Sequence, residues 1–388
     1  ISTFISINQL IYIMRYLFYL CFMAISFSSY AQTKGKLPIK SIGTLEFNKD
    51  GILFIGDSYG GAVYAVDLGD NEQSDNLEGV TIGDLEGQVA GILGTSVDNV
   101  LIHDLAVNPI SQNIYLSVSR GRAAWTSKWQ LPNDLAAADI LLKVNPKGEI
   151  SEASLENVSY SVIKLPNPVD EGTNHRWKKG VTTRVDAITG LKYNNGKLYI
   201  AGLSNEEFAA SMWVASFPFK DEISASTLEI FHGAHGKYET HAPIRTFVPY
   251  DFNNKEHIIA AYLCTPLVTF EASSFEDGQH IKGRTVAEFG SGNYPLDMVP
   301  YKNQGKDYIL MTNSQLPLLI FDPDDVNSYE GAITEEVQGY MAGVKYTPRS
   351  GSGMQQLDNL NEKFLIATQR LPSGKLALVS LSKERLVP

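Results

Sequence analysis

Histidines gather in one stretch of the sequence, where they follow the pattern His232-x2-His235-x5-His241. Imidazole nitrogens bind zinc at about 2.0–2.1 Å and bind copper or iron over a similar reach, so a loop with this spacing can converge on a metal ion. In the other interpretation, His232 ends a strand, His235 is a solvated turn residue, and only His241 or His103 reaches a site. Cys264 would add a thiolate ligand. We predict a metal site at one mouth of the fold, with these ligands: His103, His241, Cys264 and Asp297.

The identity of the metal ion stays open between a transition metal and calcium. Carboxylates such as Asp104, Asp186 and Asp297 are hard oxygen ligands that suit calcium, and Asn205 and Asn313 offer amide carbonyl oxygens. A metal ion at this place would act as a Lewis acid or activate water, which makes a metal-dependent enzyme one candidate function.

Aromatic and cationic side chains mark a second kind of site. Three of the four tryptophans fall in the two longest insertions, 121–139 and 166–186. Long loops on a rigid scaffold are where binding residues concentrate, although such loops also serve merely to plug a channel. The predicted ligand-binding residues are Trp125, Trp129, Trp177, Arg120, Arg184, Arg245, Asn313 and Arg370.

Several catalytic motifs are absent or out of context. Residues 56–60 fit the G-x-S-x-G pattern of serine hydrolases around Ser58, but that elbow needs a strand turning into a helix, whereas Ala62–Asp67 alternates as a strand. The sequence contains no P-loop, no H-E-x-x-H and no C-x-x-C. The chain therefore lacks the residues required for phosphate binding by a P-loop, for zincin-type catalysis and for thioredoxin-like redox chemistry.

The elements that must position these residues are short strands that recur along the chain. Six similar hydrophobic runs begin at residues 52, 114, 198, 258, 308 and 364, most of them after a polar hairpin turn. A third strand follows each run, and segments such as 161–165, 227–231 and 284–289 complete a unit. This period predicts an all-β protein, a six-bladed β-propeller of four-stranded blades.

Closure of the ring requires one further strand. The last unit ends near Leu381 without a clear fourth strand, while residues 37–42 read as an unpaired strand near the start of the mature chain. We predict that this N-terminal strand closes the ring, because closure removes exposed sheet edges. The alternation over 37–381 resembles secreted propellers of the NHL and YVTN type, a resemblance that implies fold more than function.

The first residues read as an export signal. Met14 and Arg15 precede an apolar run and then small residues, so we predict an upstream extension at 1–13, a signal peptide at 14–31 and a single propeller domain at 32–388. A single membrane anchor over 4–29 is the alternative, which Arg15 in mid-span disfavours. The expected location is periplasmic or secreted, with no membrane span after cleavage.

Composition narrows the partners. The chain has 388 residues, 44% hydrophobic, and a formal net charge of −11 with no long basic run, which argues against nucleic acid as a partner. Two functions remain: a propeller with a small-molecule and metal site at the top of its channel, or a non-catalytic module that binds an extracytoplasmic protein or glycan through its tryptophan loops.

Overall fold

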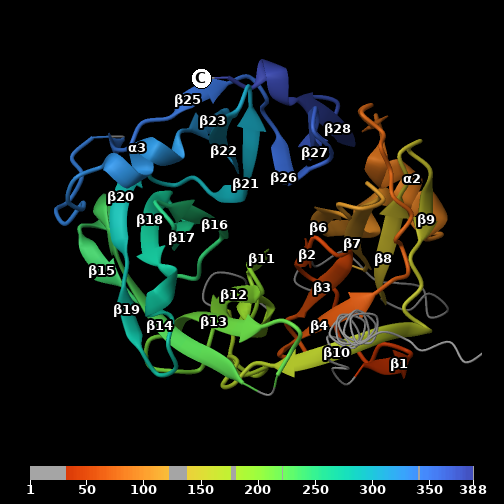
Figure 1. Cartoon of the computed structure of the whole chain (residues 1–388), viewed down its shortest axis with the longest axis horizontal. Helices are drawn as coiled ribbons and strands as arrows, with labels where there is room; N and C mark the ends of the chain where they lie inside the picture. The colour runs from red at the N-terminus through yellow and green to blue at the C-terminus, as the bar shows by residue number, and fades with distance from the viewer. Residues whose placement is uncertain (1–31, 122–137, 176–180, 221, 340, 388) are drawn as a thin grey trace, which may run out of the picture. The chain divides into compact units, whose positions relative to one another are not determined.

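The computed structural model describes residues 32–387 except 122–137, 176–180, 221 and 340. Residues 34–388 form one compact unit (Figure 1). The predicted extension at 1–13 and signal peptide at 14–31 lie outside the described residues. Among the residues that are described, no helix is long and apolar enough to cross a membrane.

The fold is a six-bladed β-propeller, as predicted, with each blade an antiparallel sheet built on four strands. Three strands of each blade are consecutive in sequence. From the axis outward they are β2 (Leu45–Phe47), β3 (Ile52–Asp57) and β4 (Ala62–Asp67) in blade 1; β6 (Val100–Val107), β7 (Ile114–Arg120) and β8 (Ala138–Val144) in blade 2; β11 (Gly190–Asn194), β12 (Lys197–Leu203) and β13 (Ala210–Ser216) in blade 3; β16 (Thr246–Phe252), β17 (Lys255–Ala261) and β18 (Pro266–Glu271) in blade 4; β21 (Pro295–Asn303), β22 (Lys306–Asn313) and β23 (Leu318–Phe321) in blade 5; and β26 (Met354–Asn359), β27 (Phe364–Arg370) and β28 (Leu376–Ser382) in blade 6.

The outer strands complete the blades less regularly. They are β10 (Val158–Lys164) in blade 1, β9 (Ile150–Glu152) in blade 2, β14 (Ile223–His232) in blade 3, β20 (Arg284–Glu288) in blade 4, β25 (Thr347–Arg349) in blade 5 and β5 (Thr81–Ile82) in blade 6. The short strands β1 (Thr33–Gly35), β15 (Lys237–Glu239), β19 (His280–Lys282) and β24 (Ala342–Gly343) and the helices α2 (Leu85–Ile92) and α3 (Pro323–Ser328) lie between or beside them.

One predicted strand does not form, and another forms but belongs to a different blade. Residues 37–42 form no strand; instead they pack Leu37 and Ile42 into the core beside blade 1, and the ring is closed by β5, which pairs with β28. The predicted strand at 161–165 belongs to β10, which completes blade 1 by pairing with β4 rather than completing blade 2. Local hydrophobicity locates a strand but does not encode its partner, because pairing is decided by packing between distant segments.

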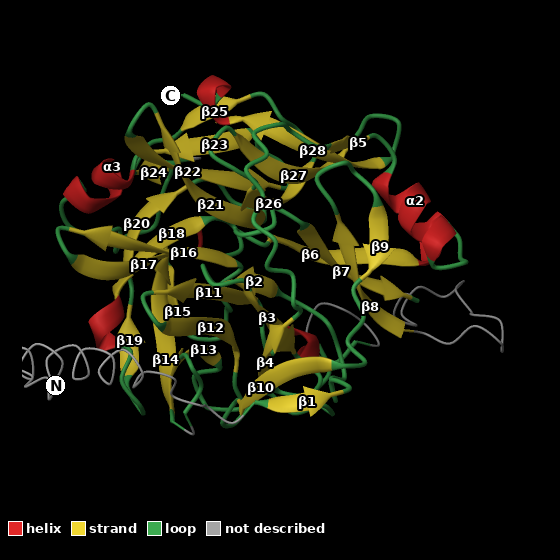
Figure 2. Cartoon of the chain, turned by 45° about the vertical axis from the view of Figure 1, so that its right-hand side comes forward, coloured by secondary structure: helices red, strands yellow, loops and turns green. Residues whose placement is uncertain are grey.

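Blades 1 and 2 are consequently transposed around the ring. The innermost strands make contact in the cyclic order β2, β6, β26, β21, β16, β11, so blade 2 lies between blades 1 and 6 (Figures 1 and 2). After β4 the chain crosses to β5 in blade 6, builds blade 2, returns as β10 to finish blade 1, and then proceeds through blades 3 to 6.

The core consists of apolar layers between adjacent blades. One layer joins Phe54 of blade 1 to Trp213 of blade 3, and another joins Met298 of blade 5 to Val248 of blade 4. Many of the second and third strands, such as β3, β7, β12 and β18, are buried on both faces, which explains their nearly continuous hydrophobic sequences. These layers fix the six innermost strands around the axis, where the polar groups described next face one another.

Candidate functional site

The central channel contains a cavity of about 350 Å³ at the end of the ring where the innermost strands begin. We call this end the top face. All six innermost strands or the residues just before them contribute to its lining, from Glu46 of β2 to Asp358 of β26. A volume of this size is within the range of small-molecule sites in proteins.

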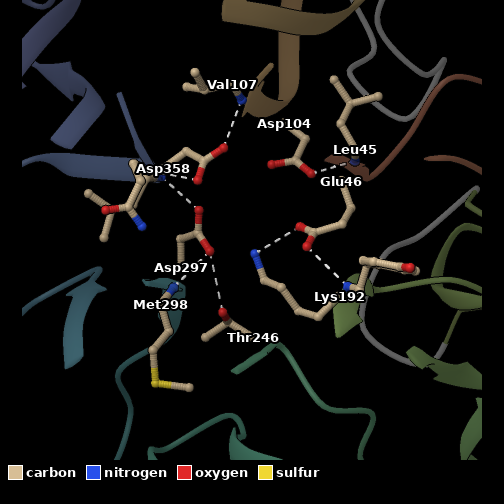
Figure 3. Close-up of polar contacts among 12 residues, drawn as sticks. Leu45, Glu46, Asp104, Val107, Lys192, Thr246, Asp297, Met298 and Asp358 are labelled. Carbon is tan, nitrogen blue, oxygen red and sulfur yellow. Dashed lines mark hydrogen bonds and ion pairs between the residues drawn. The ribbon is translucent and has the colours of Figure 1, made fainter. Parts of the chain in front are cut away.

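Four carboxylates and one lysine project into this cavity from five different blades (Figure 3). They are Glu46, Asp104, Lys192, Asp297 and Asp358, which we call the channel cluster. Asp104 and Asp297 were predicted from the sequence to lie near this mouth, whereas the other three were not. The sequence contains one signal for them, because each of the three is a charged residue that directly follows a leucine in a short innermost strand.

All four carboxylates of the channel cluster join neighbouring blades through backbone hydrogen bonds. Asp297 accepts from Met298 N on its own strand and from Leu357 N on β26, both at 2.7 Å. Asp358 repeats the pattern one blade further, accepting from Asn359 N and from Val107 N on β6.

The same relation continues around the axis. Asp104 on β6 accepts from Leu105 N and from Leu45 N on β2, both at 2.8 Å. Glu46 on β2 accepts from Tyr193 N on β11 at 3.0 Å. The carboxylates therefore hold the innermost strands of five successive blades together, which gives the channel cluster a structural role.

The positive charge in the cluster is smaller than the negative charge. Lys192 Nζ lies 3.4 Å from Glu46 Oε2, and no other lysine or arginine ion pair to these four carboxylates occurs in the described part of the chain. Burial lowers the pKa of Lys192, but the four surrounding carboxylates raise it above its ordinary value. Lys192 therefore stays charged and offsets one carboxylate.

The excess negative charge shifts the carboxyl pKa values upward. Burial and then repulsion from Asp297 raise the pKa of Asp104 to about 8. Burial raises the pKa of Asp358 to about 7, with Glu46 adding to the shift. The pKa values of Glu46 and Asp297 are also raised, mainly by burial. Without a further cation, part of the cluster carries protons at neutral pH.

Two other side chains on the cavity wall each have one polar atom without a partner in the protein. Thr44 Oγ1 and Arg245 Nε are buried atoms with no hydrogen-bond partner in the protein, and both residues line the cavity. Arg245 also lies 3.3 Å from Asp186 through its terminal nitrogen. Buried polar atoms are usually hydrogen-bonded, so these two atoms are available to water or to a bound molecule.

A separate cluster of metal-ligating side chains lies on the top face between blades 3 and 4. One potential ligand atom from each of His232, His235 and Cys264 lies within 4.8 Å of the others. His232 ends β14, His235 ends the turn that follows, and Cys264 lies in the loop between β17 and β18. Within the described ranges this is the one group of three histidine, cysteine or acidic residues so closely spaced.

The predicted metal ligands are not brought together. Cys264 belongs to the cluster with His232 and His235, whereas His241 is exposed and contacts Thr240 Oγ1 at 3.0 Å. His103 lines the channel cavity and contacts Ser119, and Asp297 links blades 5 and 6. Of the three histidines in the pattern His232-x2-His235-x5-His241, the first two belong to this cluster and the third does not.

The predicted ligand-binding residues have several different environments. Trp125, Trp129 and Trp177 lie outside the described residues. Arg245 lines the channel cavity. Buried Arg184 donates to the carbonyls of Ser58 and Val169.

The others make local contacts. Arg120 donates to the Leu93 carbonyl, Arg370 forms an ion pair with Glu86, and Asn313 caps the turn at Gln315. Of the described members of this set, Arg245 is the one on the cavity wall.

The serine-hydrolase pattern is structural, as its context predicts. Ser58 lies in the tight turn between β3 and β4, and its hydroxyl donates to the Ile188 carbonyl at 3.2 Å. Asp57 accepts from Ser41 N and Gly60 N. No strand-to-helix elbow forms there.

Comparison with known proteins adds little about function. No protein-family model and no curated protein matches the chain. The solved structures to which it is similar include a luciferin-regenerating enzyme (9% identity, TM-score 0.35, covering 90% of this chain and 96% of that one). Others are a putative glucose dehydrogenase from Thermus thermophilus (10%, TM-score 0.35, 90% and 100%) and hydrazine synthase from Kuenenia stuttgartiensis (12%, TM-score 0.37, 91% and 99%). At such identities and TM-scores these likenesses carry no argument about this chain, and the NHL and YVTN resemblance stays a prediction.

Proposed function

We propose that this propeller binds a small cationic molecule in its central cavity, with the channel cluster as the recognition site. The observation that supports this proposal is the charge imbalance: four carboxylates face one lysine around a cavity of about 350 Å³. A bound ammonium group would supply the missing positive charge and would relieve the repulsion between Asp104 and Asp297.

The hydrogen-bonding pattern supports an organic cation rather than a bare hard metal ion. Calcium takes six to eight oxygen ligands at about 2.3–2.6 Å, whereas the channel carboxylates do not converge to within 4.8 Å as a group of three. They are held apart on separate strands by their backbone hydrogen bonds. An extended molecule with ammonium groups at its ends can reach carboxylates that a single ion cannot bridge.

The cavity wall also offers contacts for a polar part of such a ligand. The free Thr44 hydroxyl can donate or accept, and the Arg245 Nε–H can donate to a carbonyl or hydroxyl oxygen. The ligand class that fits is therefore a small primary amine or diamine, and an oxygen atom in such a ligand would find a donor in Arg245. Binding of a protein or glycan through the tryptophan loops stays a prediction, because those tryptophans lie outside the described residues.

We further propose that the protein acts in the periplasm or as a secreted protein. The signal-peptide pattern at 14–31 supports this location, and the compact unit begins at Lys34, close after the predicted cleavage site. N-terminal sequencing of the exported chain would be expected to begin at Gln32. A chain that stays cytoplasmic and uncleaved would contradict this location.

Binding of putrescine tests the proposed ligand class, with butanediol as its neutral analogue. We expect putrescine to bind the wild-type protein, Asp358→Asn to bind it about tenfold more weakly, and the exposed outer-strand control Glu152→Gln to bind it as the wild type does. Equal binding of butanediol, or an unchanged affinity in Asp358→Asn, would overturn the proposal.

A further inference from the structure

The cluster of His232, His235 and Cys264 lies outside the channel cavity and has an organisation of its own. None of its members lines that cavity. The two imidazole rings lie close together, with centroids 3.8 Å apart. The chain brings them together because β14 turns back on itself through Gly233–His235 to pair with β15.

Glu239 on β15 orients both rings. Its Oε2 lies 3.0 Å from His232 Nδ1 and its Oε1 lies 2.8 Å from His235 Nδ1. A carboxylate that accepts from Nδ1–H fixes the tautomer in which Nε2 carries a free lone pair. One carboxylate thus prepares two imidazole nitrogens as ligands, an arrangement typical of metal-binding histidines.

One of those nitrogens has nothing to bind. His232 is 2% exposed, and its Nε2 is a buried atom with no hydrogen-bond partner in the protein. A buried polar atom without a partner costs about 1–3 kcal/mol unless something occupies its place. The fold therefore leaves a potential coordinating atom of His232 without a protein partner, in a residue that belongs to the cluster.

The backbone at Cys264 is also unusual. Cys264 and Thr265 have φ values of 62° and 54°, in the left-handed region that non-glycine residues rarely adopt. The turn is held by hydrogen bonds from Cys264 N to the Asn293 carbonyl and from Thr265 N to the Tyr262 carbonyl, both at 2.9 Å. Such conformations persist where the surrounding structure enforces them, and here the result is a thiol placed beside two histidines.

We propose that His232, His235 and Cys264 form a zinc site, with both histidines binding through Nε2 and the cysteine through its thiolate. Two nitrogens and one sulfur are the donors that zinc prefers, and a tetrahedral site needs ligand atoms roughly 3.3–3.7 Å apart, a small adjustment from the observed spacing. On binding, the Cys264 thiol loses its proton to solvent and the Zn–S bond forms. No oxidation or reduction takes place.

The site has three protein ligands and therefore a fourth position for water or a small ligand. A cavity of about 100 Å³ adjoins the ligand loops and is lined partly by Ala234, Gly290 and Glu288. Glu288 is 1% exposed, and its Oε2 has no hydrogen-bond partner. This cavity is the place where a molecule at the fourth position would extend.

Titration of the chelator-treated full chain with Co²⁺ tests the site, because cobalt reports its ligands by absorption. We expect one equivalent to bind with the visible bands of a tetrahedral site and a near-ultraviolet thiolate-to-cobalt band, and zinc to displace it. Cys264→Ser should lose the thiolate band, and His235→Ala, at an exposed position, should bind at least about a hundredfold more weakly. Glu239→Gln replaces one of the two acceptor oxygens with an NH2 donor, so only one imidazole keeps its acceptor, and it should weaken binding about 10- to 100-fold.

His241→Ala and His257→Ala are the matched controls, since both histidines lie outside the cluster. Their spectra and affinities should equal those of the wild type. The proposal is overturned if no cobalt binds, if Cys264→Ser keeps the near-ultraviolet band, or if His241→Ala weakens binding as much as His235→Ala does. Thermal melting of each apo variant separates loss of the site from loss of the fold.

Discussion

At the scale of single residues, Lys192 controls the charge of the channel cluster. It is the one cation paired with the channel carboxylates in the described chain, and it lies beside the cavity in which we place the ligand. Its position next to Glu46 means that it already occupies part of the negative region. A bound cation must therefore share the carboxylates with Lys192, because Lys192 already neutralises part of their charge.

Removing this lysine should create a stronger cation site. We expect Lys192→Ala to be less stable than the wild type without ligand, because it leaves four carboxylates with no positive partner. Added propylammonium should restore the melting temperature of the variant and bind it about tenfold more tightly than it binds the wild type. Thermal melting with propylammonium, and with propanol as the neutral control, measures both effects; equal effects of the two compounds would contradict the prediction.

At the scale of elements, the channel carboxylates act as connections between innermost strands. Asp297 accepts hydrogen bonds from backbone N–H groups on β21 and β26 and a third from the Thr246 hydroxyl on β16. Three blades thus meet at one side chain. The loss of such an acceptor leaves backbone N–H groups without a partner, which makes it more costly than the loss of an exposed charge.

We expect Asp297→Ala to lower the free energy of unfolding by about 3 kcal/mol, since hydrogen bonds to charged groups contribute about 1.5–3 kcal/mol and two N–H donors would be left unpaired. The exposed control Asp98→Ala should change it by less than about 0.5 kcal/mol. Denaturant unfolding measures the difference. Equal free energies of unfolding for the two variants would show that the connection through Asp297 does not contribute to stability.

The closing strand β5 gives a second prediction at this scale. Ile82 is 5% exposed and pairs with Leu378, so Ile82→Asp should place an unpaired charge in the layer between blades 2 and 6 and lower the melting temperature strongly. Val97→Asp, at a side chain that is 42% exposed, is the control and should have little effect. If both variants had the same melting temperature, β5 would not be needed to close the ring.

Most strands could be predicted from the sequence, but their partners could not. The second and third strands are hydrophobic on both faces, so their runs stand out, as at Ile52 and Phe364. β5 is two residues long with a single buried side chain, which leaves no periodic signal. β10 was visible as a strand, but nothing local assigns it to blade 1 instead of blade 2.

The same limit applied to the sites. Cys264 and the pair His232 and His235 were candidates because of their residue types, while Glu239 was missed although it follows His235 by four residues. Lys192 and Asp358 were missed because a charged residue in a short strand usually faces solvent. These two residues face the channel axis because the ring of blades is closed, and the sequence of a single strand does not show this.

At the scale of the whole molecule, the raised carboxyl pKa values link stability to pH. The pKa of Asp104 is about 8 in the folded protein, raised by burial and by Asp297, against about 3.9 in an unfolded chain. Between these values the folded state holds a proton that the unfolded state has released. The stability from Asp104 is therefore complete below about pH 4 and is lost as the pH rises through about 8.

Comparison with Asp104→Asn isolates this contribution. The variant lacks the titrating group and loses hydrogen bonding at every pH, so it should be less stable than the wild type at pH 5. Its deficit should shrink as the pH rises to 9, because only the wild type loses the contribution of Asp104 over that interval, whereas the other channel carboxyl groups titrate in both proteins. Unfolding free energies across the series measure the deficit, and a deficit that grew with pH would show that the folded-state pKa of Asp104 is not raised.

The most direct test of the central claim is calorimetric titration of the wild-type protein with putrescine at pH 6, 7, 8 and 9, in buffers of different ionisation enthalpy. A cation in the channel requires ionised carboxylates, and the pKa values of Asp358 and Asp104 are about 7 and about 8. We expect the affinity to rise with pH over this range, and protons to be released on binding at pH 6 and 7. An affinity that is independent of pH, or binding without proton release, would contradict it.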